Sequence, residues 1–147
     1  MALDTIEVAR EEIAKIYIAA FNRVPDAAGL SNWMNQYMAG LMTYKQIAAD
    51  FANQPEYTAK YPSIMTDSEY ITKIYLNVFG RTPDAGGLQN WINQIANPAV
   101  SGITRGSVMQ EMLLSAAAPG NSDGVRLANQ ADFGVQSILD GVPTATA

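Results

Sequence analysis

The feature that most constrains the fold of this chain is a thirteen-residue segment that occurs twice. Residues 21–33 have the sequence FNRVPDAAGLSNW, and residues 79–91, which lie 58 positions later, have the sequence FGRTPDAGGLQNW. In the longer alignment of residues 13–38 with residues 71–96, fifteen of the twenty-six positions are identical. Self-similarity at a fixed spacing is typical of a duplicated structural unit, so we expect two copies of one unit of roughly fifty residues.

Hydrophobic periodicity predicts an α-helix at the start of each unit. Apolar residues recur at the i, i+3, i+4, i+7 and i+8 spacing that places them on one face of a helix. In the first copy these residues are Ile13, Ile16, Tyr17, Ala20 and Phe21, and in the second they are Ile71, Ile74, Tyr75, Val78 and Phe79.

The repeated Arg-x-Pro-Asp sequence predicts a corner between this helix and a second one. Proline cannot continue a helix interior, and it disfavours the α region for the residue before it. Asp26 and Asp84 are suited to be N-caps of the second helices. Gly29 and Gly87 lie inside those helices at a cost of about 1 kcal/mol relative to Ala, which indicates close packing against a neighbouring helix. The residues expected on the buried face are Leu30, Trp33, Met34 and Tyr37, matched by Leu88, Trp91, Ile92 and Ile95.

A third helix is expected in each unit, because a weaker match joins residues 42–51 to residues 103–112 after a short insertion. Gly40 marks the end of the second helix, and Thr43 with Gln46 has the spacing of a capping box. Further along the chain, residues 125–141 predict one more amphipathic helix. Its apolar face consists of Leu127, Ala131, Val135, Ile138 and Leu139.

These patterns, with almost no strand signal, predict an all-α fold. Two tandem related helical units of about three helices each, and a C-terminal helix, are expected to pack as one domain, because two copies can bury apolar side chains that one copy would leave exposed. We place the first unit at residues 1–62 and the second at residues 63–118. A loop and the C-terminal helix occupy residues 119–141, and residues 142–147 begin a linker.

Composition excludes several classes of function. The chain of 147 residues has no cysteine and no histidine, which removes thiolate chemistry, the usual general base near neutral pH and the commonest zinc ligands. The formal net charge is -5 and the nine Lys and Arg residues are scattered, so we expect no nucleic-acid partner. No apolar run approaches the ~18–20 residues that span a bilayer, so we expect no membrane insertion. The acidic N-terminal residues lack the pattern of a secretory signal, which by itself favours a cytoplasmic protein.

The repeated motif resembles a known bacterial module, the domain of unknown function numbered 4214. The motif is Arg-x-Pro-Asp-x-x-Gly-Leu-x-x-Trp, preceded by Tyr-x-x-x-Phe and followed in the first copy by DFANQPEY. The resemblance covers roughly residues 11–118, and the second copy departs from it after Leu114, where SAAAPG stands in place of NQPEY. The residues on the pattern are Tyr17, Phe21, Arg23, Pro25, Asp26, Gly29, Leu30, Trp33, Phe51, Pro55, Glu56 and Tyr57, and in the second copy Tyr75, Phe79, Arg81, Pro83, Asp84, Gly87, Leu88 and Trp91.

The resemblance implies a cellular context more than a chemistry. Similar modules belong to large secreted or surface-attached bacterial proteins, including S-layer proteins and proteins with RTX calcium-binding repeats, which commonly leave the cell by type I secretion with an uncleaved C-terminal signal. This implies an extracellular location at the bacterial cell surface. It also implies a non-enzymatic module that binds surface polysaccharide or lipopolysaccharide and anchors a larger protein. The alternative is a structural module that packs against neighbouring copies of the parent protein.

The polar residues of the motif have two interpretations. Arg23 with Asp26, and Arg81 with Asp84, could hold an anionic sugar or phosphate, but locking of each corner is the favoured interpretation. In the same way, Trp33 and Trp91 could be platforms for sugar stacking, although their helical spacing favours packing in the core.

The connector between the units, residues 55–62 with the sequence PEYTAKYP, carries the predicted glycan site. Tyr44, Tyr57, Tyr61 and Tyr70 lie outside the apolar stripes, and Tyr57, Lys60 and Tyr61 form a cluster that suits a neutral or mildly anionic polysaccharide. The competing interpretation is that the connector tyrosines staple the two units together. Asn32 and Asn90, on the polar faces of the second helices, could bond sugar hydroxyls or simply face solvent.

Two further chemistries have weak signals. Asn121 and Asp123 in GNSDG resemble the start of a calcium loop, but the remaining acidic positions of an EF-hand are missing, so a plain turn is favoured and no metal or cofactor is expected. Asp50, Glu56, Asp67 and Glu69 bracket the connector, and two of them in one cleft could hydrolyse a sugar. Nothing in their spacing forces them together, so we expect no enzyme.

Overall fold

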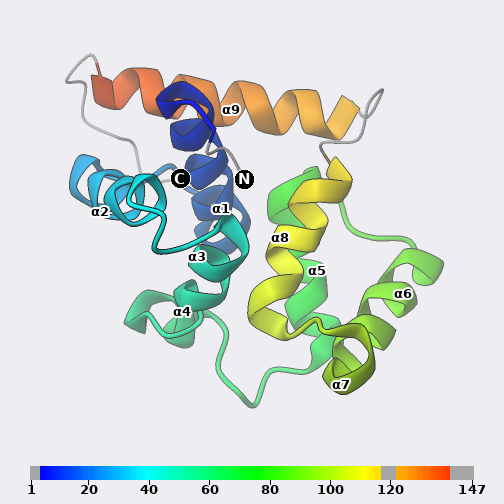
Figure 1. Ribbon diagram of the computed structural model, residues 1–147. Coiled ribbons are helices and arrows are strands. Elements are labelled where there is room, and N and C mark those ends of the chain that lie inside the picture. The colour runs from blue at the N-terminus through cyan, green and yellow to red at the C-terminus, as the bar shows by residue number, and fades with distance from the viewer. Residues whose placement is uncertain (1–3, 117–121, 140–147) are drawn as a thin grey trace.

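The computed structural model describes residues 4–116 and 122–139, and these residues form nine helices and no strand (Figure 1). The all-α prediction is therefore confirmed. The helices are α1 Ile6–Phe21, α2 Ala27–Met38, α3 Tyr44–Phe51, α4 Pro55–Lys60, α5 Asp67–Phe79, α6 Ala85–Ala96, α7 Pro98–Ser101, α8 Arg105–Ala116 and α9 Ser122–Leu139. In this described part of the chain, none of the helices has the length and apolar character needed to cross a membrane.

The helix boundaries follow from local capping chemistry. Asp26 and Asp84 are the N-caps of α2 and α6, and each carboxylate accepts a 2.6 Å hydrogen bond from the backbone N–H of the glycine three residues on. The predicted capping box of Thr43 with Gln46 opens α3. A second box, formed by Thr66 and Glu69, opens α5 and was missed by the sequence analysis.

Two short helices were also missed. No helix was predicted over residues 53–60, but α4 begins at Pro55, which can occupy a first helical turn because that turn needs no N–H donor there. Helix α7 forms at the short insertion of the second unit. The first unit therefore comprises α1 to α4, and the second comprises α5 to α8.

The helices with equivalent places in the two units pair with one another. Helix α1 packs against α5, and α3 packs against α8. At the crossing of α1 and α5, Asn77 Nδ2 donates to the carbonyl oxygen of Ala19 at 2.8 Å, and these two residues are exactly one period of 58 positions apart in the repeat. A contact between equivalent positions is what an approximate two-fold arrangement produces.

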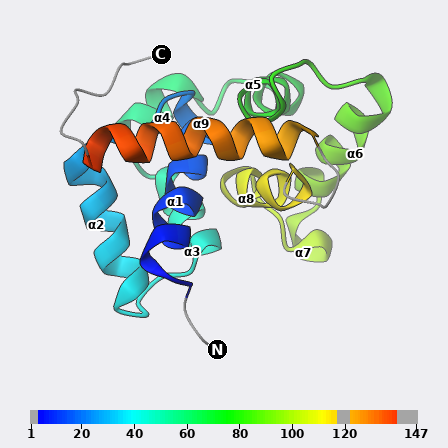
Figure 2. The same ribbon diagram turned by 90° about the horizontal axis from the view of Figure 1, so that it is seen from above.

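The apolar faces are buried unequally in the two units. In the first unit the expected residues of α1, α2 and α3 are buried, with Met34 half-buried. In the second unit Tyr75, Leu88, Trp91 and Ile92 are only half-buried, so the expectation that α6 buries the same set as α2 is wrong. Figure 2 shows α2 at one end of the molecule and α6 with α7 at the other.

Helix α9 lies across both units and packs on α1, α5 and α8 (Figures 1 and 2). Leu127, Ala131 and Val135 are buried as predicted, while Leu139 is 52% exposed. The backbone of α9 approaches the corner after α1 so closely that a Cβ atom on Gly134 would lie 2.1 Å from Val24 Cγ1. Glycine at this position is therefore a requirement of the packing.

The carbonyl groups at the C-terminus of α1 are satisfied by side chains from the following segments. A helix leaves its last four carbonyl oxygens without intrahelical partners. Here Asn77 donates to Ala19, the Tyr61 hydroxyl donates to Ala20, and Lys60 Nζ donates to Phe21 at 3.1 Å. These bonds fasten the connector and the second unit to the end of the first helix.

Candidate functional site

A pocket opens at the junction of the two units, between the connector and the start of α8. Its volume is ≈680 Å³. We call it the connector pocket. It is lined by Ala52, Tyr57, Thr58, Tyr61, Pro62, Ser63, Arg105 and Gly106.

The tyrosines of the connector pocket are held in a buried cluster. Tyr57 is 5% exposed, Tyr61 6% and Tyr70 0%. The Tyr57 hydroxyl bonds to the Tyr70 hydroxyl at 2.5 Å, and Tyr70 donates in turn to the carbonyl oxygen of Arg105 at 2.6 Å. The Tyr61 ring centroid lies 4.8 Å from that of Tyr57 and 5.2 Å from that of Tyr70. The prediction that these rings are available to stack on a sugar is wrong, because they are buried and pack against one another in tilted and edge-to-face pairs. The structure supports the competing interpretation of a staple.

Burial also affects the titration of this cluster. Desolvation raises the pKa of Tyr57 and Tyr61, and it raises the pKa of Tyr70 well above its ordinary value. The three hydroxyls are neutral near pH 7 in any case, and burial extends the pH range over which they keep their protons.

Arg105 supplies the charge nearest the connector pocket. Its Nε and Nη2 atoms donate to Asp67 Oδ1 at 2.9 and 2.7 Å, and Nη2 also donates to the carbonyl oxygen of Met65 at 2.7 Å. The guanidinium carbon lies 5.4 Å from the centroid of the Tyr70 ring. Asp67 thus compensates the charge of Arg105. Arg105 was not predicted as part of the site. Its partners lie 38 and 40 residues away, and the repeated motif gives no indication of these contacts.

The remaining predicted glycan residues lie away from the connector pocket lining. Lys60 is exposed and bonds to the end of α1. Tyr44 is half-buried, with its ring stacked on Tyr37 at 4.4 Å and its hydroxyl donating to Asp4 at 2.7 Å, and burial raises its pKa. Asn32 and Asn90 are exposed on α2 and α6.

The arginines of the motif lock their corners, as the favoured interpretation predicted. Arg23 forms a two-pronged ion pair with Glu56, at 3.1 Å from Nε and 2.6 Å from Nη2, and its guanidinium carbon lies 5.3 Å from the Tyr17 ring centroid. The bond to Glu56 raises the pKa of Arg23. Arg81 donates to the Tyr75 hydroxyl at 2.9 Å and lies 5.4 Å from that ring centroid.

The two tryptophans differ in their environments. Trp33 is 7% exposed, donates from Nε1 to the Tyr17 hydroxyl at 3.1 Å, and packs 5.3 Å from the Phe51 ring centroid. Trp91 is half-buried. The core-packing interpretation is therefore confirmed for Trp33 and holds only in part for Trp91.

The four acidic residues around the connector are each engaged separately. Asp50 accepts from Asn53 at 3.3 Å, Glu56 pairs with Arg23, Asp67 pairs with Arg105, and Glu69 closes the capping box of α5. Within residues 4–116 and 122–139, no group of three or more acidic residues could hold a metal ion. Asn121 lies outside the described residues, and so does the side chain of Asp123.

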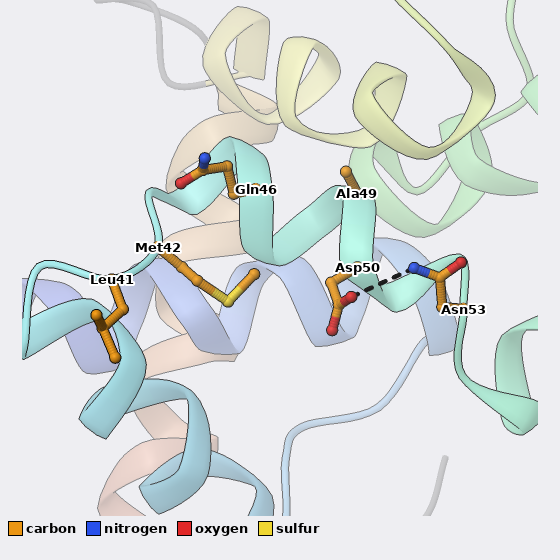
Figure 3. Close-up of a pocket in the computed structure, with 6 residues that line it drawn as sticks. All are labelled: Leu41, Met42, Gln46, Ala49, Asp50 and Asn53. Carbon is orange, nitrogen blue, oxygen red and sulfur yellow. Dashed lines mark hydrogen bonds between the residues drawn. The ribbon is translucent and has the colours of Figure 1, made fainter.

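Two other cavities are present in the described part of the chain. One, of ≈420 Å³, lies beside α3 and the loop before it, and Figure 3 shows Leu41 and Met42 reaching it from that loop while Gln46, Ala49, Asp50 and Asn53 line it from α3 and its C-terminal end. The other is an apolar groove of ≈360 Å³, lined by the first part of α1, by residues along the whole of α2 and by the end of α9. Neither cavity has an aromatic ring in its lining.

Comparison with known protein families identifies the repeated unit. The family model described as "Domain of unknown function (DUF4214)" matches the chain twice, over residues 8–61 and over residues 48–119. The two matches overlap over residues 48–61, so both of them include α4. Neither the curated proteins nor the solved structures contain a match to this chain.

Proposed function

This chain belongs to the DUF4214 family, and from that premise we propose that it is a non-enzymatic module of a secreted bacterial surface protein that binds surface polysaccharide in the connector pocket. Such binding would hold a larger protein on the cell envelope. The pocket itself is the observation that carries the proposal. Its volume of ≈680 Å³ lies within the range of about 300–1,000 Å³ that is typical of small-molecule sites, and it would take one or two sugar rings.

The lining of the connector pocket suits a hydroxyl-rich ligand. Thr58 and Ser63 are exposed and carry hydroxyl groups that can both donate and accept hydrogen bonds. Pro62, Tyr57 and Tyr61 supply the apolar part of the wall. The cluster behind that wall is closely packed, so the pocket keeps its shape without a ligand, which lowers the cost of binding.

Charge favours the neutral part of a polysaccharide. Asp67 neutralises Arg105 at 2.7 Å, and the whole chain carries a formal net charge of -5. An anionic ligand would therefore be repelled at long range and would gain little attraction in the connector pocket. We infer that lipopolysaccharide is recognised through neutral sugars rather than through its phosphates.

The test is titration calorimetry of the purified protein with isolated lipopolysaccharide and with its delipidated polysaccharide. Saturable binding of both ligands is expected, and a Ser63→Trp variant should lose it because the indole fills the connector pocket. Ser68→Trp is the matched control, since Ser68 is an exposed serine outside the pocket lining. Undiminished binding by the Ser63→Trp protein would remove the pocket from consideration.

The apolar groove supports a second candidate function, a module that packs against neighbouring copies of the parent protein. Ile6 is 50% exposed, Met38 37% and Leu139 52%, and all three lie along this groove. Sedimentation velocity should then show association that rises with protein concentration and needs no glycan. A monomer over the whole concentration range would contradict this second candidate.

A further inference from the structure

The duplicated tryptophans have diverged in use, and we infer that α6 is a second saccharide subsite in which Trp91 is the stacking platform. This inference rests on the proposed function and deepens it, because it assigns the aromatic contact that the buried connector tyrosines cannot make. The two tryptophans occupy equivalent positions of the repeated motif but lie in different surroundings.

The partners that fix Trp33 in the core are replaced at Trp91. Trp33 donates to the Tyr17 hydroxyl, but the equivalent hydroxyl, on Tyr75, accepts instead from Arg81 Nη1 at 2.9 Å. Trp33 packs against Phe51, and the equivalent position in α8 is Met112, which has no ring. Among the residues that the structure describes, Trp91 has no hydrogen bond and no aromatic ring against it, and its side chain is only half-buried.

The space beside Gly87 in α6 is less filled than the equivalent space beside Gly29 in α2. Gly87 precedes Trp91 by four residues and so lies on the same side of α6. A Cβ atom on Gly87 would meet only the Asp84 carboxylate, whereas a Cβ atom on Gly29, the equivalent residue in α2, would meet the Tyr17 hydroxyl at 2.5 Å. The side chain that fills this position in the first unit is therefore absent from it in the second.

The chemistry of α6 and α7 identifies the class of ligand. No residue from 85 to 104 is charged, and the segment carries five amide side chains, of which Asn90 is exposed. An indole ring offers a flat apolar face and an N–H donor, and amides donate and accept toward hydroxyl groups. A neutral sugar presents both an apolar C–H face and hydroxyls. Single-stranded nucleic acid would also stack on an aromatic ring, but it needs cations along the groove, and this segment has none.

The test uses the intrinsic fluorescence of the full protein with the delipidated polysaccharide as probe. A saturable change in tryptophan emission is expected in the wild-type protein and should vanish in a Trp91→Phe variant, which leaves only the buried Trp33 to report. Trp91→Ala should weaken calorimetric binding about tenfold, since an aromatic contact of this kind is worth about one factor of ten. Trp91→Phe should keep most of that affinity because it keeps a ring. Asn129→Ala, which removes an exposed amide from α9, should bind like the wild type.

Three outcomes separate the subsite from the proposed function. In the first outcome, Trp91→Ala keeps the affinity and the thermal transition of the wild type, and Ser63→Trp loses binding. This result would overturn the subsite and leave the connector pocket in place. Lost binding by Trp91→Ala with normal binding by Ser63→Trp would support the subsite and overturn the connector pocket. In the third outcome, tryptophan emission does not change with polysaccharide but changes with protein concentration, and sedimentation shows self-association. This result would overturn the saccharide assignment in favour of a protein contact.

Discussion

Gly29 and Gly87 occupy the same position of the repeated motif, yet we predict that replacing each by alanine changes stability in opposite directions. In α2, a Cβ atom on Gly29 would lie 2.5 Å from the Tyr17 hydroxyl oxygen. In α6, a Cβ atom on Gly87 would meet only the cap carboxylate of Asp84, at 3.1 Å. Since alanine is intrinsically better than glycine within a helix by about 1 kcal/mol, the neighbour decides the sign of each effect.

The stability loss expected for Gly29→Ala follows from the contacts of the Tyr17 hydroxyl. Its oxygen must move from 2.5 Å to about 3.4 Å from the new Cβ atom to make an ordinary contact. The Tyr17 ring is held 4.9 Å from the Phe51 centroid, and its hydroxyl accepts from Trp33 Nε1 at 3.1 Å. Overpacking a buried site costs about 1–3 kcal/mol and leaving a buried N–H unpaired costs about 1–3 kcal/mol. After the gain in helix propensity of about 1 kcal/mol, we expect a net loss of about 1–5 kcal/mol.

The assay is equilibrium urea unfolding followed by circular dichroism, with the thermal midpoint as a second measure. Each kcal/mol should move that midpoint by about 2–4 °C in a chain of this size. Gly87→Ala is the matched control and should leave the free energy of unfolding unchanged or raise it by up to about 1 kcal/mol.

A double-mutant cycle with Tyr17→Phe isolates the cause. Without the hydroxyl oxygen, the nearest atom of the ring to the new Cβ is Cζ, at 3.4 Å. Gly29→Ala should therefore become neutral or stabilising in the Tyr17→Phe background, although Tyr17→Phe itself costs stability by leaving Trp33 Nε1 unpaired. Equal effects of Gly29→Ala in both backgrounds, or equal effects at Gly29 and Gly87 in the wild type, would refute the argument.

Two further predictions concern buried polar groups. Gln110 is 6% exposed and its Oε1 atom has no hydrogen-bond partner in the described part of the structure, so Gln110→Met should raise the free energy of unfolding by about 1 kcal/mol, and a lower urea midpoint would contradict this. Desolvation raises the pKa of Tyr57, Tyr61 and Tyr70 above their ordinary value of 10.0 in the folded state only, so above pH 10 the native state holds more protons than the unfolded state and stability must fall as pH rises. Tyrosinate absorbance should therefore rise together with the loss of helical circular dichroism, and ionisation of all tyrosines near pH 10 with intact helices would contradict the burial of the cluster.

Much of the fold could be predicted from the sequence because the relevant physics is local. Asp26 and Asp84 cap α2 and α6 as expected, and Thr43 with Gln46 forms the capping box of α3. The buried face of α1 followed from helical periodicity alone. Helix α4 was missed because its six residues are too few to show a period, and its best signal was the proline at its start.

The candidate site could be predicted only in part. The structure has a pocket at the connector, where the site was predicted, but Tyr57, Tyr61 and Tyr70 were assigned to the surface because they fall outside the helical apolar stripes. Their burial depends on contacts with α1 and α8, which come from residues 35 to 41 positions away. Arg105 was missed for the same reason, as its role depends on Asp67, 38 positions earlier.

The sequence by itself determined where the helices begin, which faces are apolar, and that one unit is present twice, because capping and periodicity involve residues within a few positions of one another. Only the tertiary structure decided that the two copies differ. Trp33 and Trp91 occupy equivalent positions of the repeated motif, but Trp33 meets Tyr17 and Phe51, whereas the hydroxyl of Tyr75 accepts from Arg81 instead. Burial is a property of what lies across space from a side chain, so similar segments acquire different surroundings and different degrees of burial.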